Sequence, residues 1–475
     1  MTPRIRHSLF ILFVIAFFVI TPLVSLYAAG YKIKLSWPIN FKQTLSKTGM
    51  FIIDTTPHGA KIFIDGKPSQ LFFKKYYNKE ASYITTPAKI KDILPGEYTV
   101  RVELPGYWPW EKKLAIGPGQ STYAENIFLF KNDVPMQMAD LSVKETNFSQ
   151  IPLRKISQSP NKKYFFVLNE EKAIITSENG DSTIIPFSSL KKQIKPAPSI
   201  SWSSDSGKIL AGKIIFNVSD PKKIIYLEEI LGRSADNFVW DRNNTNKLYY
   251  QSGDSIGYLD LTSNTGKTLL SGEKYLAYFP NNDNVFFISQ TSQDTRLKEF
   301  SLKTETITKN IELPSSSEYK FINPEHNLLN IYDAKHEILY LIDPSLPISP
   351  LKEIINNIKY TYWVNNNKLL FGNDFEIWLL DLDNSGPLAQ SGKKILTRIS
   401  QPINAILWHP SNNYVIFTTN ENINIIELDE RERRNVTELF KTEKIYSPFL
   451  DQKGDILYFG AKIGNQEGVY KLEIQ

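Results

Sequence analysis

The stretch Ile200–Gly212 reads ISWSSDSGKILAG: an apolar strand that ends near a tryptophan, a polar turn, and a second apolar strand. Similar units recur down to the C-terminus, and one anchor residue marks each of them, about 42 residues apart on average. The anchors are Gln158, Trp202, Trp240, Tyr278, Phe321, Trp363, Trp408 and Phe449. A period of ~40–45 residues with several short strands per unit is typical of four-stranded propeller blades. The chain from 132 to 475 is therefore predicted to be a β-propeller of eight blades, with seven as the alternative.

The last unit is one strand short. It holds apolar segments at 445–449, 456–459 and 469–474, after which the chain stops. A segment at about Val134–Val143 precedes the first unit and is predicted to supply the fourth strand. Such pairing of the first and last segments removes an exposed sheet edge, which favours it physically.

The polar turns of these units carry a resemblance. WSSDSGK at 202–208 and FPNNDN at 279–284 are similar to turns of TolB-type and WD-like propellers. The units lack the Gly-His and Trp-Asp pairs of true WD repeats, and the single dipeptide Trp240-Asp241 sits at an anchor rather than at the end of a third strand. The resemblance implies a propeller fold and names no ligand.

A smaller β-domain is predicted at 48–131. Phe51/Ile53 and Ile62/Ile64 alternate with other residues across a TPHGA turn, and Tyr98, Val100 and Val102 share one strand face, followed by Leu114 and Ile116 in a closing strand. Pro-Gly and Asp-Gly pairs mark the turns. The pattern predicts a compact β-sandwich.

Five short motifs of this domain resemble the PEGA domain in order and spacing. They are PHGA at 57–60, IDG at 64–66, TP at 86–87, LPGEY at 94–98 and GY at 106–107. His58 stands where the family's name-giving Glu would be, and the link from Pro68 to Thr85 is longer than usual. The glycines and prolines that set the turns are present. The resemblance implies an interaction or structural module with no known chemistry of its own.

The N-terminus is predicted to anchor the chain in a membrane. Ser8–Gly30 carries no charge, and a helix of this length spans a ~30 Å hydrocarbon core. Arg4 and Arg6 precede it, which favours a cytoplasmic tail at 1–7 and a stalk at 31–47 on the outside. A cleaved signal peptide is the alternative, but the apolar run is longer than such signals need. Both readings place the remainder outside the cytoplasm, and the lipid bilayer is the expected partner of the helix.

Composition narrows the chemistry. The 475 residues include no cysteine, which excludes disulfides, thiolate metal sites and a cysteine nucleophile. A net charge of +5 is spread over 55 basic and 50 acidic side chains without a basic block in the folded region, so no nucleic acid is expected as a partner. Cofactors are not expected either.

Sequences that resemble catalytic or ligand motifs fail on inspection. Gly253–Gly257 fits G-x-S-x-G but lies between two predicted strands. His336 opens an H-E-x-x-H motif in which Tyr340 replaces the second histidine, and Asp381–Gly386 begins a calcium loop whose twelfth position is a glycine. Gly266–Thr268 lacks the first glycine of a phosphate loop and is predicted to be a turn. The five histidines stand singly.

Aromatic residues of the small domain are the candidate binding surface: Trp108, Trp110, Phe72 and Tyr76. For the two tryptophans the other interpretation is packing on the sheet and covering of its edge. The aromatic residues of the extended link, with lysines between them, could touch lipid headgroups or the second domain.

The expected function is that of a membrane-anchored, surface-exposed binding or scaffold protein of the cell envelope, not an enzyme. Its ligand would be bound by the small domain or by propeller loops, with cell-wall glycan or another envelope protein as the possible partner. The alternative is an extracytoplasmic hydrolase or lyase whose site forms at the channel mouth from several blades, which a linear sequence cannot reveal.

Overall fold

A computed structural model describes residues 3–33, 45–70, 83–140, 155–168, 172–177, 181–190, 199–292, 294–322, 326–347, 350–384 and 392–475. The chain divides into two compact units. The first consists of 1–134 together with 425–439 and 473–475, and the second of 135–424 with 440–472. The first unit therefore takes in a short segment that is distant in sequence, and the two units are described in turn.

The first unit begins with helix α1 (Pro3–Ala28), which starts earlier than the predicted apolar run. Its segment Ile5–Ala28 is long and apolar enough to cross a membrane, and apolar side chains are exposed all along it. Gly30, at a φ of +81°, ends the helix, and Thr48 donates both its N–H and its hydroxyl to the Gly30 carbonyl. Strand β1 (Tyr31–Ile33) follows at once and pairs with β2 (Leu45–Lys47).

A two-sheet sandwich forms the rest of the first unit, as predicted. One sheet has the order β6 (Ala88–Ile93), β3 (Gly49–Thr56), β9 (Ser121–Phe128), and the other the order β5 (Lys67–Pro68), β4 (Lys61–Ile64), β7 (Gly96–Glu103), β8 (Trp110–Ile116). Most residues that the alternation singled out lie in the core, where Phe51, Ile53, Ile62, Val100, Val102, Leu114 and Ile116 are buried, while Ile64 and Tyr98 are partly buried and pack against it. The pairing of apolar faces across the two sheets is what stabilises this small domain.

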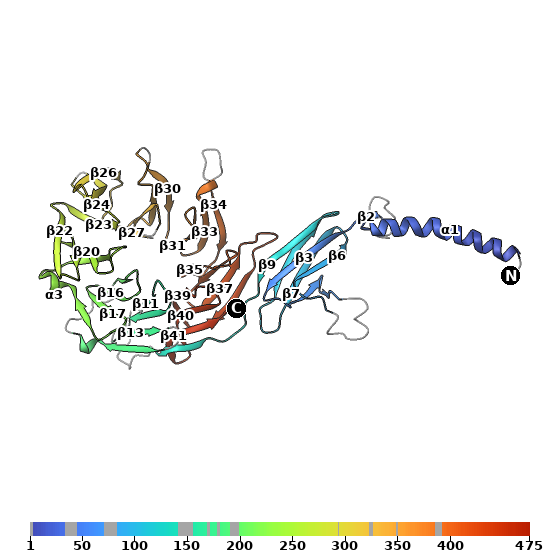
Figure 1. Ribbon diagram of the computed structural model, residues 1–475, viewed down its shortest axis with the longest axis horizontal. Coiled ribbons are helices and arrows are strands. Elements are labelled where there is room, and N and C mark those ends of the chain that lie inside the picture. Colours follow the sequence, from blue (N-terminus) through green and yellow to red (C-terminus); the bar gives the residue numbers. More distant parts are fainter. Residues whose placement is uncertain are drawn as a thin grey trace. The chain divides into compact units, whose positions relative to one another are not determined.

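Among the described residues, eight four-stranded sheets lie between 136 and 473 and follow one another around a ring (Figure 1). Five of them are β11 (Lys155–Gln158) to β14 (Ser182–Pro186), β15 (Ile200–Trp202) to β18 (Ile224–Tyr226), β19 (Asp236–Trp240) to β22 (Thr265–Ser271), β23 (Lys274–Asn281) to β26 (Thr306–Leu313) and β27 (Tyr319–Ile322) to β30 (Leu351–Asn356). The others are β31 (Tyr360–Trp363) to β34 (Lys393–Arg398), β35 (Ala405–Trp408) to β38 (Val436–Lys441), and β39 (Lys444–Leu450), β40 (Ile456–Ile463) and β41 (Gln466–Glu473) with β10 (Met136–Asp140).

The middle strands of these sheets complete the inventory of elements. They are β12 (Tyr164–Leu168), β13 (Lys172–Ser177), β16 (Lys208–Ala211), β17 (Ile214–Asn217), β20 (Lys247–Ser252), β21 (Ser255–Asp260), β24 (Asn284–Gln290), β25 (Thr295–Ser301), β28 (Leu329–Asp333), β29 (Ile338–Ile342), β32 (Lys368–Gly372), β33 (Glu376–Asp381), β36 (Tyr414–Thr418) and β37 (Asn422–Glu427). Short helical turns α3 (Leu227–Leu231), η3 (Phe187–Ser189) and η4 (Leu382–Asn384) lie between strands.

The repeat predicted from the sequence matches this architecture. Each of the eight anchor residues lies in the first strand of its own repeat unit, from Gln158 in β11 to Phe449 in β39. The strand expected before the first unit is β10, which pairs antiparallel with β41 of the last sheet. An all-β propeller fold with pairing of its first and last segments is thereby confirmed.

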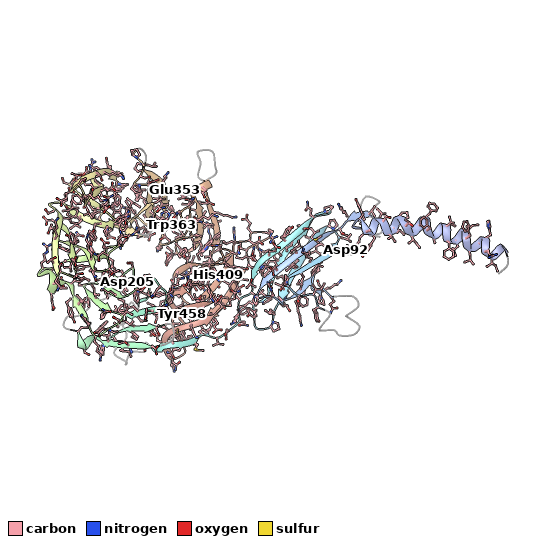
Figure 2. All side chains as sticks on the ribbon, viewed as in Figure 1. Asp92, Asp205, Glu353, Trp363, His409 and Tyr458 are labelled. Carbon is pink, nitrogen blue, oxygen red and sulfur yellow. The ribbon has the colours of Figure 1, made fainter. Side chains whose placement is uncertain are left out.

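Turns between the first and second strands link neighbouring sheets by hydrogen bonds. The bonded pairs are Asn161 with Ser206, Lys208 with Thr245, Asn243 with Asn282, His326 with Asn366, His409 with Gly454, and Lys162 with Asp451. Asp205 and His409 mark two of these turns in Figure 2. Serine, asparagine, lysine and histidine side chains therefore join neighbouring sheets, in most cases by bonding a backbone group of the next sheet.

Candidate functional site

Strand β8 of the first unit presents an unusual inward face. Its alternation places Trp110, Lys112, Leu114 and Ile116 on the buried side of the sheet. Lys112 is fully buried, with an exposed fraction of 1%. An ammonium group in such a position is costly unless a carboxylate pairs with it.

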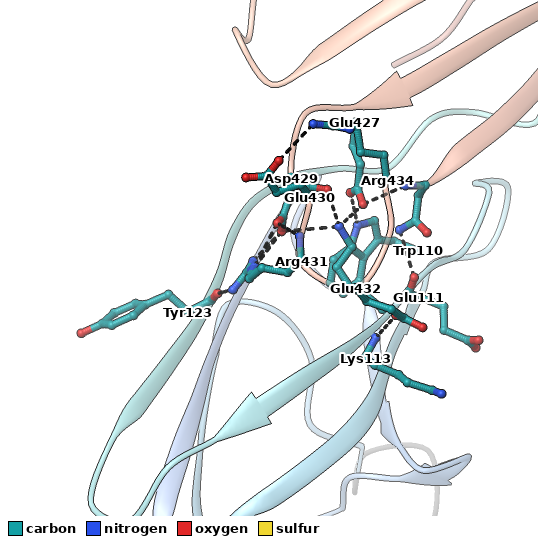
Figure 3. Close-up of polar contacts among 12 residues, drawn as sticks. Trp110, Glu111, Lys113, Tyr123, Glu427, Asp429, Glu430, Arg431, Glu432 and Arg434 are labelled. Atoms are coloured by element: carbon teal, nitrogen blue, oxygen red, sulfur yellow. Dashed lines mark hydrogen bonds and ion pairs between the residues drawn. The ribbon is translucent and has the colours of Figure 1, made fainter. Parts of the chain in front are cut away.

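The partner of Lys112 comes from the distant segment 425–439. Lys112 Nζ forms an ion pair with Glu427 Oε1, whose side chain is also buried, and donates to the Asp429 carbonyl at 2.8 Å. Trp110 Nε1 donates to the other oxygen of Glu427 at 2.9 Å (Figure 3), and the Asn435 backbone N–H donates to Oε1 at 3.0 Å. Both carboxylate oxygens of Glu427 are thereby occupied by donors.

Further bonds hold the same segment against the sandwich. Glu432 accepts from the Lys113 backbone N–H at 2.6 Å, and Arg431 donates to the Tyr123 carbonyl at 2.6 Å. Arg431 also binds Asp429 through several bonds. Burial alone would raise the pKa of Asp429, but these Arg431 bonds and the charge of Lys112 outweigh it and hold that pKa below its ordinary value.

This cluster has a structural role. The sequence pattern predicts Trp110 as a binding residue. In the structure only 6% of Trp110 is exposed, so its ring is not available on the surface of the unit. Trp108 is partly buried, its backbone N–H donates to the Phe130 carbonyl at 2.8 Å, and its indole N–H has no hydrogen-bond partner among the described residues. Phe72 and Tyr76 lie outside the described residues.

A groove in the second unit is the stronger candidate for ligand binding. It lies between β30, the outermost strand of one sheet, and β33 and β34 of the next, and encloses a cavity of about 270 Å³. Buried Phe371 and partly exposed Trp378 are among its lining residues, with ring planes 12° apart. Ile354, Asn356, Asn357 and Lys393 also line it; we call this site the β30–β33 groove.

The charged groups of the groove occur in two pairs. Lys393 Nζ donates to Glu353 Oε1 at 2.9 Å and to the Ile354 carbonyl at 3.3 Å; Glu353 is labelled in Figure 2. Trp378 Nε1 donates to Glu376 Oε2 at 3.1 Å, and Arg398 Nε donates to Oε1 at 2.7 Å. The bond from Trp378, followed by that from Arg398, holds the pKa of Glu376 below its ordinary value.

The motifs set aside in the sequence lie in ordinary sheet structure. Ser255 of the G-x-S-x-G match begins β21, directly after the turn from β20, and its hydroxyl donates to the Ser252 carbonyl at 2.7 Å. The turn predicted at Gly266–Thr268 is wrong, because these residues lie within β22. The turn precedes them at 261–264. The loop after Asp381 lies partly outside the described residues.

One cluster has the composition of a hydrolase triad without its order. Asp333 Oδ1 accepts from the Ser316 hydroxyl at 2.6 Å, and its Oδ2 lies 2.6 Å from His336 Nδ1. A serine nucleophile needs its hydroxyl next to the imidazole, with the carboxylate behind the histidine. Here the carboxylate stands between the other two and also accepts backbone N–H groups of its own turn. In the described residues no group of three or more His, Cys, Asp or Glu side chains is arranged to hold a metal ion.

Sequence reasoning missed both polar clusters. The alternation W-x-K-x-L-x-I at 110–116 did contain a signal, since a lysine at an inward position requires a buried acid. The identity of that acid, more than 300 residues away, was not readable. The groove gave no signal, because its residues come from separate strands and each occurs in an ordinary strand or turn.

Comparison with known proteins agrees with the fold of the small domain. Residues 80–127 match the PEGA domain, which confirms the resemblance of the small domain. No curated protein matches the chain in sequence.

Two solved structures are similar to part of the chain. The Cps50 (Swd1) β-propeller domain of Myceliophteria thermophila is similar over 61% of this chain and 98% of that domain, with 13% identity and a TM-score of 0.41. Porphyromonas gingivalis dipeptidyl peptidase 4 is similar over 65% of this chain and 56% of its own, with 9% identity and a TM-score of 0.45. At such identities the similarity concerns the fold alone.

Proposed function

We propose that this chain is a membrane-anchored binding or scaffold protein of the cell envelope, whose propeller holds the ligand outside the cytoplasm. The observation that carries the proposal is the β30–β33 groove, where the partly exposed ring of Trp378 and the exposed side chains of Asn356 and Asn357 line one cavity. The apolar segment Ile5–Ala28 and the PEGA domain support an anchored, non-catalytic module.

Retention by envelope material tests the binding role. The full chain in lipid nanodiscs is incubated with purified cell-wall glycan and, separately, with solubilised envelope proteins. Empty nanodiscs serve as the control. We expect retention by at least one of these fractions above that control, and retention by neither would refute the binding role.

The orientation is tested independently. Because the chain contains no cysteine, Ser263→Cys introduces a unique thiol on an exposed turn of the propeller. A membrane-impermeant maleimide should label this variant in cells whose inner membrane is intact. Labelling only after that membrane is permeabilised would place the propeller in the cytoplasm and contradict the proposal.

A further inference from the structure

The β30–β33 groove carries no uncompensated charge. Its two charged lining residues, Lys393 and Glu376, are each bonded to a group of opposite charge, Glu353 and Arg398 respectively. These pairs also fix the rim of the groove, since Lys393 reaches across to the Ile354 carbonyl. An anionic or cationic ligand would have to compete with these internal pairs, so the groove suits a neutral ligand.

Amide groups at the rim remain available for hydrogen bonding. Asn356 and Asn357 line the cavity with exposed side chains, and among the described residues their amides have no hydrogen-bond partner. A primary amide offers both donors and an acceptor, the combination that a hydroxyl group matches from either side. Two adjacent free amides therefore suit a ligand with several neighbouring hydroxyls.

Two lining residues of the groove are aromatic, and one of them, Trp378, is held in place. Trp378 is fixed by its bond to Glu376 and by the parallel ring of Phe371, so its orientation costs little entropy on binding. A flat aromatic face suits the C–H face of a sugar ring, which is apolar while its edges carry hydroxyls. A volume of about 270 Å³ accommodates a small ligand or one unit of a longer polymer.

We propose that the β30–β33 groove binds a neutral saccharide unit of a glycan chain, with the sugar ring against Trp378 and its hydroxyls on Asn356 and Asn357. This inference rests on the proposed binding function and names its ligand class. The glycan is the polymer, and the groove binds one uncharged sugar unit of it.

Calorimetric titration of the full chain in nanodiscs tests the inference, with neutral β-1,4-linked oligomers of glucose and of N-acetylglucosamine as probes. Asn356→Ala should weaken binding about threefold to tenfold, the effect of one lost hydrogen bond. Trp378→Ala should abolish binding, and Trp378→Phe should retain part of it, which guards against misfolding of the alanine variant. Asn310→Ala removes an exposed amide from β26, another outermost strand, and should leave affinity unchanged.

The second readout is how the affinity depends on ionic strength and on the charge of the ligand. Affinity should stay constant between low and high ionic strength, because screening does not affect a neutral ligand. Each of four results would overturn the inference. They are no binding of either oligomer, an unchanged affinity in Asn356→Ala, a salt-sensitive preference for an acidic glycan, and Asn356-dependent binding of a peptide.

The same variants distinguish a failure of this inference from a failure of the proposed binding function on which it rests. If envelope material retains wild type and Asn356→Ala equally, the binding function stands and the groove assignment fails. If envelope material retains neither protein, the binding function itself fails.

Discussion

Two tryptophans of this protein make the same bond in opposite settings. Trp110 donates its indole N–H to Glu427 at 2.9 Å, and Trp378 donates its own to Glu376 at 3.1 Å. Trp110 and Glu427 are buried, and a buried lysine completes the first carboxylate. Trp378 is partly exposed, and an arginine exposed at 70% completes the second. The polar groups around Trp110 stabilise the fold. The bonds around Trp378 hold its ring in place and leave it partly exposed.

The largest expected effect comes from opening the buried pair. Glu427→Ala leaves Lys112 buried with only Asp429 nearby, and should destabilise β8 by about 3–5 kcal/mol. Amide hydrogen exchange of residues 110–116 in the full chain reports this local stability. Glu305→Ala is the matched control, since its pair with Lys267 is exposed at 70% and 58% and should change stability by less than about 1 kcal/mol.

A double variant sharpens this result. Lys112→Met with Glu427→Leu removes both charges, so it should be less destabilised than Glu427→Ala alone, although the Trp110 and Asn435 N–H groups lose their acceptor. Equal destabilisation of the two variants would mean that the unpaired lysine is not the source of the cost.

Replacing each tryptophan by phenylalanine should give the next largest effect, a difference between the losses of stability of the two strands. Trp110→Phe removes a buried donor and leaves space in the core, and should cost β8 about 1–3 kcal/mol. Trp378→Phe should cost β33 less than about 1 kcal/mol, because water can replace the lost bond at a partly exposed site. Hydrogen exchange of the two strands compares them in one experiment, and similar losses would erase the distinction drawn between the sites.

The sequence predicted most of the fold because the fold is local and repeated. The anchors from Gln158 to Phe449 each mark a first strand, and the alternation at Phe51/Ile53 and Ile62/Ile64 located the sandwich core. The same logic failed at Gly266, where a glycine inside strand β22 looked like a turn residue.

The sites were beyond the sequence for a different reason. Glu427 meets Lys112, and Trp378 and Asn356 line one cavity, only through pairings that no local pattern encodes. Trp110 illustrates the consequence: an aromatic-rich run suggested a binding surface, while the burial of that residue depends on a segment some 300 residues later. The sequence shows where aromatic residues occur, but only the tertiary structure shows which of their side chains are exposed.

Acid should affect both carboxylates in the same direction. The pKa of Glu376 is lowered by its bonds from Trp378 and Arg398, and that of Asp429 is lowered by Arg431 and Lys112 against the opposing effect of burial. Each group then contributes stability fully above its unfolded pKa of about 4, and this contribution is lost as pH falls through the lower folded pKa.

Hydrogen exchange corrected for its intrinsic pH dependence should therefore show no loss from these groups between pH 7 and 5, and a loss below about pH 4. Glu376→Gln should remove the acid-dependent part at β33 while β8 keeps its own. A loss at β33 that begins near pH 6 would indicate a raised rather than a lowered pKa of Glu376.

The smallest effect is expected at the exposed end of the groove. Arg398→Ala removes the partner of Glu376 Oε1 but leaves Oε2 to hold the Trp378 indole, and Arg398 is exposed at 70%. Stability of β33 should change by less than about 1 kcal/mol, since water screens such a pair. Saccharide affinity in calorimetry should stay within about twofold of wild type because the aromatic face remains fixed. A large loss of affinity without loss of stability would instead show that the guanidinium itself contacts the ligand, and would move the recognised unit from a neutral to an acidic sugar.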